Sequence, residues 1–200
     1  VETGALCEPA LSEAVPAAAG QLAYVETMLF LDWSPRALGL DACVRFVTET
    51  PAFHYERPSV PVDFRSAVVC CPGNYVGCAD GYADRQVRLT HLADYAAWLD
   101  AGPADYAAAK SAVVEHQIAT LDRRFPGLAA AVQGWDMFTP HTIRRYTSHV
   151  NGAIYGSPDK RRDGTTALRN LFLCGTDQGF LGIIGSLLSG VSMANAHLLR

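Results

Sequence analysis

The sequence predicts an α+β or α/β fold: a mixed, largely antiparallel sheet with helices, followed by a separate C-terminal strand and helix. Three observations support this. Residues 21–99 contain short runs of β-branched and aromatic residues separated by Gly, Pro and Asn. Residues 106–121 follow a helical period, and the segment from residue 170 onward passes from an apolar run through a glycine-rich turn into a second helix. Half of the 200 residues are hydrophobic, which is ample for a core.

Four runs between residues 21 and 99 are predicted as strands: "QLAYVETMLFLDW", "ACVRFVTE", "RSAVVCC" and "RQVRLTHLADY". In the fourth run, alternation places Val87, Leu89 and His91 on the face opposite Arg88, Thr90 and Leu92. The run "AVVCC" is apolar throughout, as in a strand covered on both faces. The sequence therefore predicts a sheet with a buried centre.

An amphipathic helix is predicted after Pro103, which suits a first helical turn. Its inward positions recur at helical spacing until "RRFPG" closes the segment. These positions are Tyr106, Lys110, Val113, Val114, Gln117, Ile118 and Leu121. Residues 133–165, rich in glycine, proline and aromatic side chains, are predicted as a long functional loop.

The last segment, "NLFLCGTDQGFLGIIGSLLSGVSMAN", is predicted to form a buried strand, a glycine turn and a helix. Such a turn brings backbone N–H groups and the positive end of a helix dipole close to a ligand. Glycine at 182 and 185 lets the backbone approach a flat ring or a phosphate, and Asp177 is an acceptor suited to sugar hydroxyls. The alternative is that the glycines serve packing alone. The helix presents an apolar stripe: Leu187, Leu188, Val191, Ala194 and Leu198.

Composition excludes several function classes. The net charge is −4, with 16 basic and 20 acidic side chains, so no basic footprint for nucleic acid is expected. No apolar run reaches the roughly 18–20 residues of a membrane span, and no secretory signal is evident. A cytoplasmic protein is expected. The run "DKRR" at 159–162 is interpreted as a solvated turn, the alternative being peripheral contact with an anionic membrane surface.

Neither the cysteines nor the histidines follow a metal-binding pattern, and no metal site is predicted. No Ser/His/Asp arrangement stands out either. The cysteines are expected to be reduced core residues. They are Cys7, Cys43, Cys70, Cys71, Cys78 and Cys174.

The run "LFLCGTDQGFLGIIGSLLSGVSMAN" resembles the C-terminal FAD-binding segment of the phytoene desaturase, prolycopene isomerase and retinol saturase family. It is most similar to the retinol saturase branch in its G-x-D-x4-G-[IL]-[IV]-G spacing. "FPGL" at 125–128, "TPHT" at 139–142 and "GAIYG" at 152–156 are similar to elements that precede this segment in those flavoproteins. The resemblance covers residues 100–200 well and residues 20–99 only in their strand pattern.

This resemblance implies a two-domain flavoprotein. Residues 1–138 would be part of the substrate-binding domain, and residues 139–200 would complete a Rossmann-type FAD-binding domain. The N-terminal GxGxxG motif that binds the ADP half of FAD is absent from these 200 residues. Since residue 1 is not methionine, we expect either a C-terminal piece of a longer polypeptide or a subunit whose Rossmann half is a separate chain.

The resemblance also assigns site residues. Asp177 matches the acidic residue near the ribityl and pyrophosphate groups, and Gly175 permits the turn. Gly182, Ile183, Ile184 and Gly185 match the turn along the isoalloxazine, with a helix starting near Gly185 and aimed at the ring. The catalytic residues stay unassigned. Four loop residues are candidates for lining the substrate channel or supporting the flavin, against an ordinary surface or packing role: His141, Arg145, Tyr146 and Tyr155.

The implied function is FAD-dependent desaturation or saturation of C–C bonds in an apolar polyene, isoprenoid or lipid. The sequence contains no cluster of charged side chains to clamp a phosphate or carboxylate, which agrees with an apolar substrate. Because the ADP-binding half is missing, the 200 residues alone are expected to be inactive and to bind FAD weakly or not at all. The alternatives are a redox-neutral flavin-dependent isomerase and a non-catalytic lipid-binding or scaffold fragment.

Overall fold

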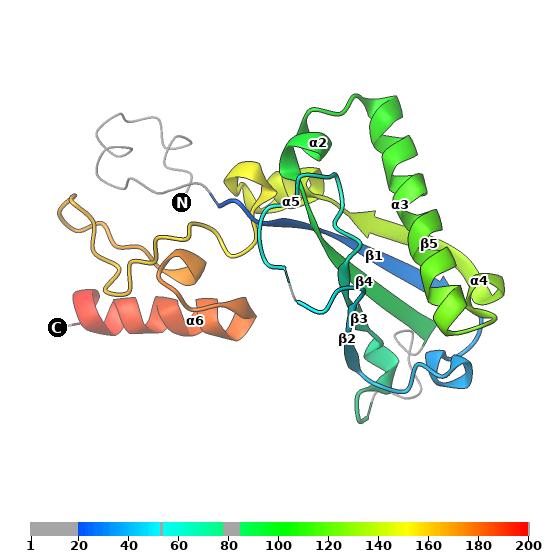
Figure 1. The fold of residues 1–200 in the computed structure, drawn as a ribbon. Coiled ribbons are helices and arrows are strands. Elements are labelled where there is room, and N and C mark those ends of the chain that lie inside the picture. The colour runs from blue at the N-terminus through cyan, green and yellow to red at the C-terminus, as the bar shows by residue number, and fades with distance from the viewer. Residues whose placement is uncertain (1–19, 53, 78–84, 200) are drawn as a thin grey trace. The chain divides into compact units, whose positions relative to one another are not determined.

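The structure is a computed structural model that describes residues 20–52, 54–77 and 85–199. The described chain divides into two compact units, one of residues 22–142 and a smaller one of residues 20–21 and 143–199 (Figure 1). The division falls within helix α5, Pro140–Thr147. Each unit is described by itself below.

The larger unit is α+β, with a five-stranded sheet in the order β2-β3-β4-β1-β5. All pairings between these strands are antiparallel, so the mixed sheet that the sequence predicts is antiparallel throughout its described strands. The strands are β1 Ala23–Leu31, β2 Val44–Thr48, β3 Ser66–Cys70, β4 Gln86–Ala93 and β5 Val132–Phe138. Four of them confirm the strands predicted between residues 21 and 99.

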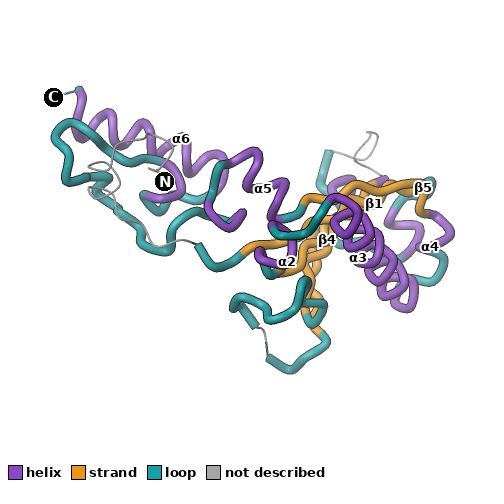
Figure 2. Tube along the Cα trace, turned by 90° about the horizontal axis from the view of Figure 1, so that it is seen from above, coloured by secondary structure: helices purple, strands orange, loops and turns teal. Residues whose placement is uncertain are grey.

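One face of this sheet packs beneath helix α3, Pro103–Arg124 (Figures 1 and 2). Burial alternates strictly along β1 and β4, and the register pairs Val25 with His91 and Thr27 with Leu89. This arrangement confirms the predicted inward side of β4. The face beneath α3 is therefore where the core of the larger unit lies.

Helix α3 confirms the predicted amphipathic helix, with Pro103 in its first turn. The buried side chains of α3 are Val113, Val114, Gln117 and Leu121. At its C-terminal end the chain turns at Gly127, whose φ of 94° favours glycine. Two shorter helices flank it, α2 at Tyr95–Leu99 and α4 at Leu128–Ala131.

Two predictions for the larger unit are wrong. Residues 133–138, predicted as loop, belong to edge strand β5, where only Met137 is buried, so the sequence lacks the alternation of an inner strand. Strand β3, predicted to be covered on both faces, buries only Val69. Its other side chains stay half-buried because α3 covers only one face of the sheet and β3 lies next to its edge.

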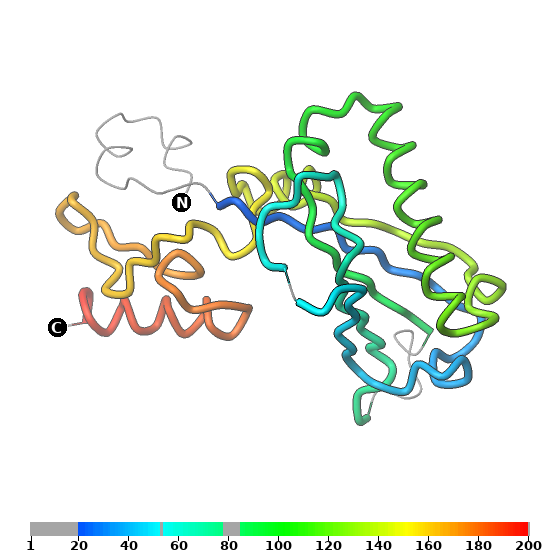
Figure 3. Tube along the Cα trace, viewed as in Figure 1, coloured from blue at the N-terminus to red at the C-terminus, as the bar shows by residue number. Residues whose placement is uncertain are grey.

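The smaller unit consists mainly of turns that lead to one helix (Figure 3). Its elements are the 3-10 turns η5 Val150–Gly152 and η6 Gly175–Asp177, helix α6 Gly182–Met193 and a π-helical turn Ala194–Leu198. The buried strand predicted at 170–174 is absent. Phe172 makes a single bridge to Thr165, and Asn170 has a left-handed φ of 63° that interrupts extended backbone. The final helix begins at Gly182, three residues before the predicted start.

Cysteine burial also differs from the prediction. Cys71 is buried, Cys43 and Cys70 are half-buried, and Cys174 is exposed; all four are free thiols. Cys7 and Cys78 lie outside the described residues. Burial raises the pKa of the Cys71 thiol to about 11, so this side chain is an unreactive packing group. Among the helices described here, none combines the length and apolarity needed to cross a membrane.

Candidate functional site

The predicted flavin segment forms a 3-10 turn followed by an uncapped helix start. Gly175 begins the turn with a φ of 85°, and Gly182 begins α6 with a φ of 75°. The N-cap residue is Leu181, and no hydrogen bond from its side chain caps the first turn of α6. The first N–H groups of a helix have no partner within the helix. This helix end therefore favours an electron-rich group.

The residues at the start of α6 point away from the interior of their unit. Ile183 is 91% exposed and Ile184 is 73% exposed. A Cβ placed on Gly182 would meet no described atom within 4 Å. The residues that the sequence predicts to lie along a flavin are therefore accessible on the surface of the smaller unit.

Gly185 has a packing explanation instead. A Cβ at this position would lie 3.1 Å from the carbonyl carbon of Phe180, closer than side-chain carbons normally approach. Glycine thus lets α6 fold back against the turn that precedes it without displacing Phe180. The two predicted glycines therefore have different roles. Gly182 suits a left-handed φ, whereas Gly185 allows the Phe180 backbone to approach closely.

Asp177 is a buried carboxylate with structural partners. Its Oδ1 accepts the Ser157 N–H at 2.8 Å, and its backbone oxygen accepts the Arg161 N–H at 3.0 Å. Burial acts to raise the pKa of this carboxyl, but the Ser157 hydrogen bond and the nearby Lys160 ammonium hold the pKa below its ordinary value. Gly156 packs against the carboxylate so closely that a Cβ would overlap Oδ1. Asp177 therefore ties residues 156–161 to the glycine turn.

A buried polar network that the sequence analysis missed fixes the same turn to α6. The Gly175 N–H donates to Ser189 Oγ at 2.6 Å, and that hydroxyl donates to Gln178 Oε1. Gln178 Nε2 donates to the Arg162 carbonyl at 2.7 Å. Ser189 is fully buried and Gln178 nearly so. The sequence feature that could have indicated this network is Ser189, a polar residue among the apolar residues of the final helix.

The four loop candidates are divided between the two units. His141 is exposed in the larger unit, with its ring 5.5 Å from that of Tyr106. In the smaller unit, the exposed Arg145 lies over the ring of Tyr146 at 5.6 Å. Tyr155 is half exposed and has a left-handed φ of 62°. Helix α5 holds the first three of these candidates, in a stretch that the sequence analysis took as loop.

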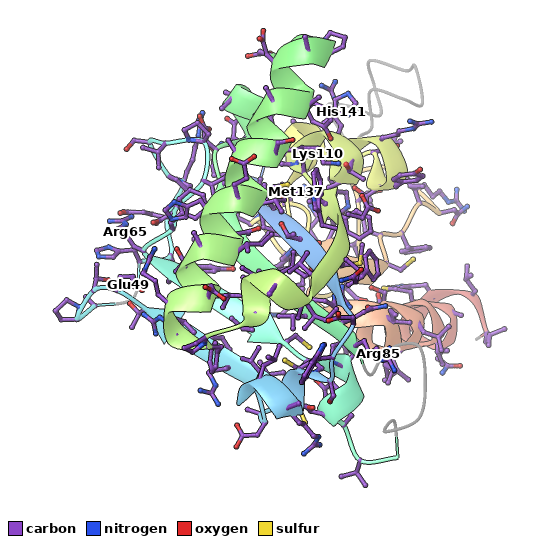
Figure 4. The ribbon with its side chains drawn as sticks, turned by 90° about the vertical axis from the view of Figure 1, so that its right-hand side faces the viewer. Glu49, Arg65, Arg85, Lys110, Met137 and His141 are labelled. Atoms are coloured by element: carbon purple, nitrogen blue, oxygen red, sulfur yellow. The ribbon has the colours of Figure 1, made fainter. Side chains whose placement is uncertain are left out.

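The larger unit contains a cavity of about 30 Å³ between α3 and the sheet. It adjoins an open groove of about 750 Å³, and both are lined by Glu49, Phe64, Arg65 and His116. Figure 4 shows Glu49 and Arg65 along the same side of α3. This groove gathers charged side chains that the sequence analysis did not anticipate.

Opposite charges neutralise one another at this groove. Asp63 binds Arg65 through both carboxylate oxygens, at 2.9 and 2.7 Å, and Arg124 pairs with Glu49. The hydrogen bond from Arg65 lowers the pKa of Asp63. In the described part of the chain, no three His, Cys, Asp or Glu side chains are grouped to hold a metal ion.

The sequence matches no protein-family model and no curated protein. The family, the cofactor and the substrate class remain predictions.

Proposed function

We propose that this chain is the C-terminal part of an FAD-dependent oxidoreductase related to phytoene desaturase and retinol saturase. It would desaturate or saturate C–C bonds of an apolar polyene, isoprenoid or lipid. The observation that carries the proposal is the start of α6, where Gly182 begins a helix whose N-cap side chain makes no capping hydrogen bond and the apolar Ile183 and Ile184 are exposed. These features meet the two needs of a flavin ring, namely a flat apolar contact and donors for its polar edge.

The residues of this segment would have distinct tasks. Ile183 and Ile184 would pack against the ring, while the first backbone N–H groups of α6 and its dipole would stabilise negative charge at the polar edge. FAD, when bound, supplies the hydride-transfer chemistry. Asp177 would act mainly by holding the turn in place, because Ser157 already occupies one of its carboxylate oxygens.

A partner half would complete the domain. The GxGxxG unit for the ADP moiety is not in these 200 residues, so it must come from elsewhere in the same polypeptide or from a separate chain. The exposed apolar side of α6 supports this idea, since Leu187 is 70% exposed and Val191 is 52% exposed. Apolar area of this kind marks contact surfaces for another protein segment, a membrane or a ligand, and we assign it to the partner half.

An apolar substrate is supported by the face of the sheet opposite α3. Tyr24, Met28 and Phe30 alternate along β1 on that face and are half-buried. The ion pair between Arg88 and Glu26 neutralises the charges that lie among them. Along β1 this face is therefore apolar and aromatic apart from the neutralised Glu26, which favours a long hydrocarbon over a charged metabolite.

The test combines the chain with the polypeptide that carries the dinucleotide-binding unit and measures flavin absorbance in the purified complex. Two substitutions are compared, Gly182→Val and Gly127→Val. Both place a branched side chain on a left-handed backbone, with φ of 75° and 94°, but they lie in different units. We expect only Gly182→Val to lose flavin at high FAD concentration. Full flavin occupancy in Gly182→Val would overturn the proposed site.

The remaining alternatives differ in product and colour. A desaturase or saturase changes the substrate mass by two hydrogens, whereas a redox-neutral isomerase leaves it unchanged. A non-catalytic lipid-binding or scaffold protein would give a colourless complex. The isolated 200-residue chain is expected to bind FAD weakly or not at all, and tight stoichiometric binding would show that the ADP-binding half is not required.

A further inference from the structure

The cavity beneath α3 contains buried polar atoms that have no hydrogen-bond partner among the described residues. Gln117 is 1% exposed, and neither its Oε1 nor its Nε2 has a hydrogen-bond partner among the described residues. Nε2 of His91, a side chain 7% exposed, is also unpartnered there. Both side chains line the same cavity. Buried polar groups are normally satisfied, so such a concentration needs an explanation.

The hydrogen-bonding capacity of these atoms is well defined. Nδ1 of His91 lies 2.9 Å from the Ser66 carbonyl oxygen, so Nδ1 carries the proton of the neutral ring and Nε2 is an acceptor. Burial lowers the pKa of His91, and this effect outweighs the hydrogen bonds to the Ser66 and Asp63 backbones, which raise it. Gln117 adds one carbonyl acceptor and one N–H₂ donor. The cavity thus presents two acceptors and one donor group.

The rest of the lining is apolar. Val69 and Leu89 are a cross-strand pair on the covered face of the sheet, and Leu121 of α3 lies opposite them. At the side shared with the groove, the ring centroids of Phe64 and His116 lie 4.0 Å apart. A volume of about 30 Å³ holds a group of two or three heavy atoms, and a larger ligand would have to extend toward the groove.

We propose that this cavity binds the primary carboxamide of a small neutral ligand. A carboxamide has one carbonyl acceptor and two N–H donors, which is the complement of the Gln117 amide and His91 Nε2. Its carbonyl would accept from Gln117 Nε2, while its two N–H groups would donate to Gln117 Oε1 and His91 Nε2. The ligand's apolar body would lie at the rim, against Phe64 and His116.

This complementarity also defines what the cavity should reject. A carboxylate would place negative charge against two acceptors in a desolvated site, which is unfavourable. A tertiary amide has no N–H to donate and would leave both acceptors unpaired. A primary carboxamide should therefore bind better than a carboxylate or tertiary amide on the same body.

Benzamide is a suitable probe, with benzoate and N,N-dimethylbenzamide as matched controls. Binding to the 200-residue chain is followed by NMR through the side-chain N–H₂ signal of Gln117, without flavin. We expect benzamide to shift this signal saturably and each control to bind at least about tenfold more weakly, as expected for lost buried hydrogen bonds.

Two glutamine substitutions separate the site from the surface. Gln117→Leu should weaken benzamide binding at least about tenfold while keeping the fold, since leucine suits an apolar cavity. Gln133→Leu, at an exposed position of the same unit, should leave the affinity unchanged. For the leucine variants, binding is measured from the benzamide signals, and Trp98 fluorescence checks folding. Absence of a Gln117 shift, equal binding of benzoate, or unchanged affinity in a folded Gln117→Leu variant would each overturn the proposal.

Discussion

The two units of this chain reach a defined structure by different means. The larger unit has a continuous hydrophobic core between its sheet and α3, in which Leu29 and Val114 are almost completely buried. In the smaller unit, the buried apolar side chains among the described residues are Ala153 and Leu173. Its buried positions are mainly polar, including Asp177, Gln178 and Ser189. One unit is thus stabilised chiefly by apolar burial and the other by specific hydrogen bonds.

Backbone geometry differs in the same way. All four non-glycine residues with positive φ among the described residues lie in the smaller unit: Ser148, Asn151, Tyr155 and Asn170. Such conformations are unfavourable for residues with a Cβ and persist when surrounding contacts fix them. The comparison indicates that the smaller unit tolerates local strain in exchange for a particular turn geometry, as binding sites commonly do.

The largest expected effect comes from deleting core side chains. Leu29→Ala should reduce the free energy of unfolding by about 2–5 kcal/mol, because it leaves a cavity in a packed interior. Leu187→Ala, at a side chain 70% exposed on α6, should change it by less than about 0.5 kcal/mol. Denaturant unfolding measures both variants. A loss in Leu187→Ala as large as that in Leu29→Ala would mean that the α6 face is already buried.

The next effect tests the hydrogen bonds of the smaller unit. Asp177→Ala should cost about 1.5–3 kcal/mol, since it removes a charged acceptor and leaves the Ser157 N–H unpaired. Asp177→Asn keeps an oxygen at this position and should cost less. Hydrogen exchange of the Ser157 amide measures the loss locally. Unchanged protection of this amide in Asp177→Ala would show that the carboxylate does not hold the turn.

The difference between buried and exposed elements also explains which of them could be predicted from the sequence. Strands β1 and β4 were predictable because one face is buried and the side chains alternate with a period of two. Strand β5 was not, since it lies at an edge and buries only Met137. The run at 170–174 is as apolar as a strand, but among the described residues of its unit it has no partner strand. A sequence does not show which strands will pair.

The candidate site shows the same limit. Gly175 and Gly182 were recognisable because a left-handed backbone favours glycine. The Ser157 partner of Asp177 lies twenty residues earlier in the chain, and Ser189 reaches the Gly175 N–H across fourteen residues. Such contacts depend on the folded path of the chain. The helical spacing placed Gln117 on the inward face of its helix, but it did not predict that the Gln117 amide would lack a hydrogen-bond partner among the described residues.

Acid titration should separate the two units by the pH at which each loses stability. The pKa of His91 in the larger unit is lowered by burial, so the folded state binds fewer protons than the unfolded state. Its contribution is complete above the unfolded pKa of about 6.5 and is lost as pH falls below that value. The pKa of Asp177 in the smaller unit is also lowered, and its contribution is lost only below the ordinary value of 3.8.

Intrinsic fluorescence allows this measurement, because Trp33, Trp98 and Trp135 all belong to the larger unit. We expect the stability reported by tryptophan to begin falling near pH 6.5 in the native sequence and to fall less in His91→Phe. Asp63 has a lowered pKa in the same unit, so a second loss below its ordinary value of 3.8 should persist in this variant. Identical profiles above pH 5 would show that His91 is not buried as a neutral ring.

The smallest expected effect is at the exposed ion pair beside the groove. Glu49→Gln removes the partner of Arg124, and both side chains are substantially exposed. The expected loss is about 0–1 kcal/mol and should shrink with added salt. Denaturant unfolding at low and high ionic strength measures it. A loss comparable to that of Leu29→Ala would mean that charge pairing, and not apolar burial, dominates this side of the larger unit.

The strand order has a consequence for synthesis of the chain. β1 ends at Leu31, yet it pairs with β4, which begins at Gln86, and with β5, which ends at Phe138. At about 5–20 residues per second, the ribosome needs on the order of five to twenty seconds to make the segment between β1 and the end of β5. β1 has neither neighbour until β4 is made, and it lacks β5 until the end of that interval. Chaperone binding to the emerging polypeptide should therefore be strongest before β5 leaves the exit tunnel.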